Sequence, residues 1–80
     1  MNKAEFIKKI KQIKEEVSYS KNIYDFNIIK NKYDNFITEI SKLTPKFYNS
    51  NIKFIMIEFY KTEVVFNKIK EIVIHKEIIN

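Results

Sequence analysis

The sequence predicts an all-α protein, a small three-helix bundle that runs up, down and up and has a long C-terminal helix. In three consecutive stretches the apolar residues recur at alternating spacings of three and four, which is typical of one buried helix face. The 80 residues contain no Gly, so the usual turn signal of a β-hairpin is missing, and a single Pro separates the second stretch from the third. We therefore expect one domain over residues 1–80, with helices at about 2–17, 22–43 and 45–78.

The first predicted helix, residues 2–17, is short and has one apolar face. Its apolar residues follow a 4-3-4 spacing: Phe6, Ile10, Ile13 and Val17. Ile7 widens this stripe, and Lys and Glu occupy most of the remaining positions. This distribution predicts a helix with one buried side and one solvated side.

The second predicted helix, residues 22–43, has the clearest pattern in the chain. Asn22 is the best N-cap of the preceding polar stretch, and Asp25 follows three residues later. The apolar line along this helix is a strict 3-4 alternation: Phe26, Ile29, Tyr33, Phe36, Ile40 and Leu43. Such a line predicts packing against neighbouring helices along its whole length.

The third predicted helix begins at Thr44-Pro45, because Pro cannot continue a helix but is favoured at its first position. Its line keeps the same alternation: Tyr48, Ile52, Ile55, Phe59, Thr62, Phe66, Ile69, Val73 and Lys76. Residues 49–51 offer a second helix start, and the many β-branched residues also allow a strand over 52–60. Because no Gly or Asn-Gly turn follows Tyr60, one long helix is the better interpretation.

The third helix is longer than its predicted partners. At 1.5 Å per residue it spans about 45 Å, whereas the first two helices span about 24 and 33 Å. Part of it should therefore lack cover within the chain. Several apolar residues also lie off its main line: Phe54, Ile57, Tyr60, Val64 and Ile74. Either this helix is the central helix of its own bundle, or its C-terminal half docks on another chain.

A chain of this size is at the lower limit of what folds without help. Small domains commonly add disulfides, a structural metal or an oligomeric interface, and this chain has no Cys. We therefore expect association, as a homodimer or a larger assembly at micromolar concentration or as a complex with a partner protein. The chain shows no stretch that resembles a membrane span or a secretory signal, and we expect a cytoplasmic location.

The residue types present exclude several kinds of chemistry. Without Gly the chain has no phosphate-binding loop, dinucleotide-binding turn or EF-hand. With no Cys and with His75 as the only His, it lacks the residues of a zinc site, and the spacing of its Ser residues, His75 and its Asp residues does not suggest a catalytic triad. His75 is better explained as a surface residue near a helix C-terminus. We expect no enzymatic activity, no metal and no cofactor.

The net charge of +5 comes entirely from Lys and carries little information about a partner. Lys, Asn, Ile, Phe and Tyr, which have AT-rich codons, dominate the chain, and Arg is absent. An AT-rich genome, such as that of a low-GC bacterium or of a phage or plasmid within it, explains this composition without selection for a basic surface. A dimeric nucleic-acid-binding regulator nevertheless stays an alternative, through the lysines of the first helix and the following turn: Lys8, Lys9, Lys11, Lys14 and Lys21.

The leading hypothesis is a small non-enzymatic protein-binding module. An inhibitor, an antitoxin-like regulator or an assembly subunit, encoded by a phage or another mobile element, fits this description. Tyr24 joins the off-line residues of the third helix as a contact candidate, because exposed Tyr favours protein interfaces. The predicted partner-binding residues are Phe54, Ile57, Tyr60, Val64, Ile74 and Tyr24. The partner is another protein or a second copy of the chain, and we do not expect a membrane.

Overall fold

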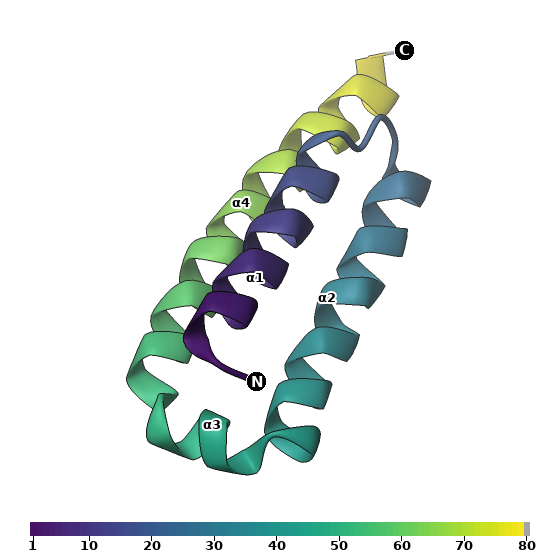
Figure 1. Ribbon diagram of the computed structural model, residues 1–80. Helices are drawn as coiled ribbons and strands as arrows, with labels where there is room; N and C mark the ends of the chain where they lie inside the picture. The colour runs from purple at the N-terminus through teal and green to yellow at the C-terminus, as the bar shows by residue number, and fades with distance from the viewer. Residues whose placement is uncertain (80) are drawn as a thin grey trace.

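Four α-helices make up the computed structural model, which describes residues 1–79. They are α1 (Lys3–Ser18), α2 (Ile23–Leu43), α3 (Pro45–Ser50) and α4 (Ile52–Ile79). Figure 1 shows α1, α2 and α4 side by side, with α2 running opposite to the other two and α3 at one end. The molecule is elongated, with extents of 47 × 18 × 15 Å. All regular structure within residues 1–79 is helical, so the all-α prediction is confirmed, and the alternative strand over 52–60 is wrong.

Two Asn side chains start the first two helices. The Asn2 side-chain oxygen accepts the backbone N–H of Glu5 at 2.9 Å, and that of Asn22 accepts the N–H of Asp25 at 2.8 Å. Each bond satisfies an amide that has no partner within the first helical turn. The predicted start of the second helix, with Asn22 as its cap, is therefore confirmed.

The prediction of one continuous helix over 45–78 is wrong, because the helix is interrupted at Asn51. This residue has φ −125° and ψ 24°, and its side-chain amide donates to the carbonyl of Phe47 at 2.9 Å. Asn competes with the helical ladder in this way, which ends α3. The Asn51 carbonyl then accepts the N–H of Ile55 at 2.9 Å and so opens α4.

The core is built on aromatic rings. Phe6 of α1 is fully buried, and its ring centroid lies 5.7 to 5.9 Å from those of four other Phe residues: Phe36, Phe47, Phe54 and Phe59. A second group lies further along the bundle, where Tyr33 stacks on Phe66 at 4.9 Å. The two groups together join all four helices into one core.

The predicted overhang of the last helix is limited to its last turns. Along α4 the buried side chains extend from Ile55 to Val73. Near its end, the Glu77 carboxylate accepts the backbone N–H of Ile23 at 2.8 Å, so the first turn of α2 reaches the last turns of α4. The break at Asn51 shortens α4, and its inward face is covered from Ile55 to Val73, whereas residues 74–78 are exposed. None of the helices within residues 1–79 combines the length and the apolar character needed to cross a bilayer.

Tyr33 is the polar member of the core. Its side chain is 1% exposed, and its hydroxyl donates to the carbonyl of Phe59 at 3.2 Å. Burial raises the pKa of the Tyr33 phenol far above its ordinary value, and the carboxylates of Glu63 and Asp34 raise it further. The folded state therefore holds this phenol protonated at a pH where the unfolded chain ionises it.

This shift predicts a loss of stability in alkali. The contribution of the protonated Tyr33 phenol to the free energy of unfolding is fully present below the pKa of about 10 that this phenol has in the unfolded chain. It is lost as the pH rises above that value. Between about pH 9 and pH 11, the free energy of unfolding should fall more steeply for the parent than for Tyr33→Phe. Urea unfolding at both pH values measures the difference. Equal losses in the two proteins would show that ionisation of Tyr33 is not coupled to folding.

Candidate protein-interaction surface on α4

The outward side of α4 carries a group of exposed apolar side chains. Ile57, Tyr60 and Val64 are 55%, 70% and 50% exposed, and their spacing of three and four places them on one helix face. Met56, which is 47% exposed, lies beside them. We call these four residues the α4 patch. Isolated exposed apolar residues are common, but a contiguous group of this kind is typical of an interaction surface.

The rigidity of the α4 patch comes from the opposite side of the same helix. Ile55, just before the patch in the sequence, and Phe59 and Thr62, between its residues, are buried and pack towards α1 and α2. Thr62 satisfies its hydroxyl locally by donating to the Glu58 carbonyl at 2.7 Å. The patch is therefore presented by a helix that the core already holds in place.

Only part of the predicted partner-binding set comes together in the structure. Phe54 is half-buried, lies 5.8 Å from the Phe6 ring and carries the Lys3 ammonium 5.1 Å above its own ring, so it belongs to the core. Ile74 is 38% exposed and follows Val64 by ten residues, which is about 15 Å along the helix. Tyr24 is 71% exposed but lies in the first turn of α2, near the C-terminal end of α4.

The lysines predicted as an alternative nucleic-acid surface do not form one track. Lys9 lines a groove between α1 and α2, whereas Lys11 and Lys14 line a hollow between α1 and α4. Lys21 lies in the connection after α1, where its backbone N–H donates to Asp25 at 3.3 Å. Lys8 is exposed. One duplex would have to contact different sides of α1 to reach all of them, so this arrangement gives the alternative no support.

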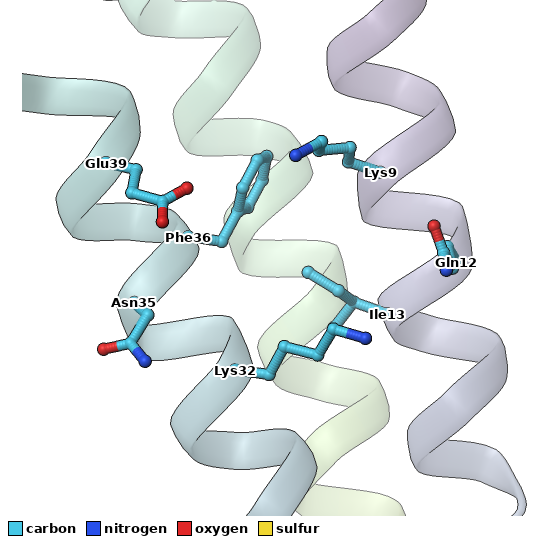
Figure 2. A pocket seen from close by; sticks show the side chains of 7 residues that line it. All are labelled: Lys9, Gln12, Ile13, Lys32, Asn35, Phe36 and Glu39. Carbon is cyan, nitrogen blue, oxygen red and sulfur yellow. The ribbon is translucent and has the colours of Figure 1, made fainter. Parts of the chain in front are cut away.

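A groove with a mixed polar and apolar lining and a volume of about 300 Å³ lies between α1 and α2. Figure 2 shows its seven lining side chains: Lys9, Gln12 and Ile13 from α1, and Lys32, Asn35, Phe36 and Glu39 from α2. Its cations already have partners in the fold. Lys32 pairs with Glu16 at 2.9 Å, and the Lys9 ammonium lies 5.9 Å from the Phe36 ring centre. These two contacts connect α1 to α2.

Within residues 1–79 no three His, Cys, Asp or Glu side chains come close enough together to hold a metal ion. Comparisons of the chain with protein-family models, with curated proteins and with solved structures gave no match. The interpretation of the α4 patch therefore depends on its own geometry and chemistry.

Proposed function

We propose that the chain is a non-enzymatic, cytoplasmic protein-binding module that holds its partner through the α4 patch. The observation that supports this proposal is the exposure of Ile57, Tyr60 and Val64, each at least half exposed, on one face of a helix whose other face is fully packed. Exposure of large apolar side chains to water costs free energy. Burial against a partner recovers that free energy.

The bundle suits this role because it fixes the contact residues before binding. α4 is held by the core from Ile55 to Val73, so little backbone entropy is lost when a partner docks. Tyr60 supplies a large contact area and a hydroxyl at the centre of the patch, which is the usual chemistry of an interface anchor. The spacing of Ile57, Tyr60 and Val64 matches the ridge that a helix inserts into the groove of a second helix.

The biological setting that we propose is an inhibitor, an antitoxin-like regulator or an assembly subunit of a mobile genetic element. Its support is the composition of the chain, which indicates an AT-rich genome, together with its small size. A second copy of the chain is the other occupant that the sequence analysis proposed for this helix.

We expect Ile57→Glu with Val64→Glu to abolish association with a partner while leaving the protein helical. Both side chains are exposed, so the folded chain tolerates the charges, but a carboxylate buried without a partner in an interface costs several kcal/mol. Affinity capture of partners by the purified protein from its native cells, together with light scattering for self-association, measures the effect. Circular dichroism checks the fold.

The matched control is Ile28→Glu with Leu43→Glu on α2. These residues are 49% and 75% exposed, so the control adds the same charge to equally accessible apolar positions away from α4. The control should keep the association of the parent. If both double variants associate as the parent does, or if the parent neither self-associates nor captures a protein, the α4 patch is not a binding surface.

A further inference from the structure

Exposed lysines give the α4 patch a basic margin, which we call the lysine row. Lys53, Lys61 and Lys68 are exposed, and together with Ile57 and Val64 they form one row in which successive residues are three or four positions apart. Residues at these spacings are neighbours on a helix surface, so lysine and aliphatic side chains alternate along this row.

Helix α1 extends this margin. Lys11 and Lys14 line the hollow of about 320 Å³ between α1 and α4, together with Val65 of α4. The same hollow contains the acidic residue Glu15. The lysine row and α1 together therefore contribute five lysines next to the patch residues: Lys11, Lys14, Lys53, Lys61 and Lys68.

The acidic residues nearby do not cancel this charge. Glu58 lies 3.6 Å from the Lys61 ammonium, and this is the one ion pair in the described part of the chain that involves any of the five lysines. Glu63 lies on the α2 side of α4, where its charge acts on Tyr33. Glu71 follows Lys68 by three residues and continues the row with an acidic residue beyond Lys68. From Lys53 to Lys68 the lysine row thus contains no acidic residue.

We infer that the α4 patch receives an amphipathic helix of another protein, in which Asp and Glu residues flank the apolar contact residues. This inference rests on the proposed function and adds the chemistry of the partner to it. Apolar residues at intervals of three and four on the partner would contact Ile57, Tyr60 and Val64, while carboxylates beside them would face the lysine row. Complementary charge of this kind accelerates association and selects the partner.

Charge also distinguishes this partner from the other occupants. In a symmetric dimer the same surface meets itself, and two antiparallel α4 helices paired around the point between Tyr60 and Lys61 would place Lys53 opposite Lys68 of the second copy. A nucleic-acid backbone would neutralise the lysines but leave Ile57 and Val64 against phosphates. Ile57, Tyr60 and Val64 form a ridge on a helix that is fixed in a bundle. A lipid surface offers no groove that would receive this ridge.

Selection from a displayed peptide library tests the inference. The library consists of helical peptides with apolar residues at intervals of three and four and with Asp, Glu, Lys or Ser at the flanking positions. Selection is performed on the folded protein, and binders that also bind Ile57→Glu with Val64→Glu are discarded, so that the remaining peptides require the patch. We expect these peptides to be enriched in Asp and Glu at the flanking positions.

The second measurement uses charge reversal. Lys61→Glu with Lys68→Glu should weaken the selected acidic peptides about tenfold at low salt, and added salt should reduce the difference. Selection on this variant should return Lys-rich peptides instead. Lys42→Glu with Lys46→Glu, which are exposed on α2 and α3, gives the same net charge and should bind as the parent does.

Several results would overturn the inference. They are the absence of patch-dependent peptides, selected peptides without acidic enrichment, and equal binding by the parent and the Lys61/Lys68 variant. Tighter binding of the parent to phosphatidylglycerol vesicles or to a random DNA duplex than to the peptides would assign the lysine row to lipid or to nucleic acid. A further outcome is that the Ile57/Val64 variant loses a captured partner that the Lys61/Lys68 variant keeps. In that case the proposed function stands, and the inference of an acidic partner helix is wrong.

Discussion

Phe6→Ala is expected to leave most of the protein unfolded at room temperature. Its ring is fully buried and contacts one or more Phe rings from each of the other three helices: Phe36 of α2, Phe47 of α3, and Phe54 and Phe59 of α4. Truncating a buried Phe to Ala costs about 3–5 kcal/mol, because both transfer free energy and cavity terms are lost. The core of a domain of this size supplies about the same amount in total.

The matched control is the adjacent residue. Ile7 is 47% exposed, so Ile7→Ala should change the free energy of unfolding by at most about 1 kcal/mol. Urea unfolding followed by circular dichroism measures both variants. If Phe6→Ala unfolds at the same urea concentration as Ile7→Ala, the four-helix aromatic contact does not stabilise the fold.

Ile40→Ala is expected to cost about 2–5 kcal/mol, and Phe36→Ala should fall in the same range. Ile40 is 1% exposed and lies on the apolar line of α2, where it packs into the core. Leu43 lies on the same line in the sequence, but it is 75% exposed. Leu43→Ala should therefore change stability by only about 0.5 kcal/mol.

The physical reason for this difference is the end of the bundle. Leu43 is the last residue of α2 and lines a shallow hollow with Met1, whereas α1 begins only at Lys3. No helical turn of α1 lies opposite Leu43 to bury it. Thermal unfolding of the two variants checks the assignment, and a similar drop in melting temperature for Ile40→Ala and Leu43→Ala would contradict it.

Most of the core could be predicted from spacing, because a helix that packs along one side must repeat its apolar residues at that spacing. Phe6 and Val17 in α1, and Ile55 and Phe66 in α4, are buried as their pattern predicts. The break at Asn51 could not be predicted in this way. The 3-4 alternation continues through Tyr48 and Ile52 across the break. Residues 49–51 allow a second helix start, and the side-chain bond of Asn51 to the Phe47 carbonyl shows that the helix does break there.

The α4 patch could be predicted only in part. Ile57, Tyr60 and Val64 lie off the apolar line of the predicted helix. Their positions alone therefore predict that their side chains point away from the core. Phe54 lies off the same line but is half-buried, because α1 packs against that edge of α4. Which edges of a helix its neighbours cover depends on how the helices are placed in space, and spacing within one helix does not determine it.

The placement of the two chain ends has a practical consequence for engineered forms of the protein. Met1 lies at the α3 end of the bundle and α4 ends at the opposite end, so the ends are separated along the 47 Å axis (Figure 1). Joining residue 1 to the end of α4 for circular permutation would need a long linker, since such designs work best where the joined ends are close. Fusion between two other proteins, by contrast, would make this bundle a stiff spacer that holds them apart.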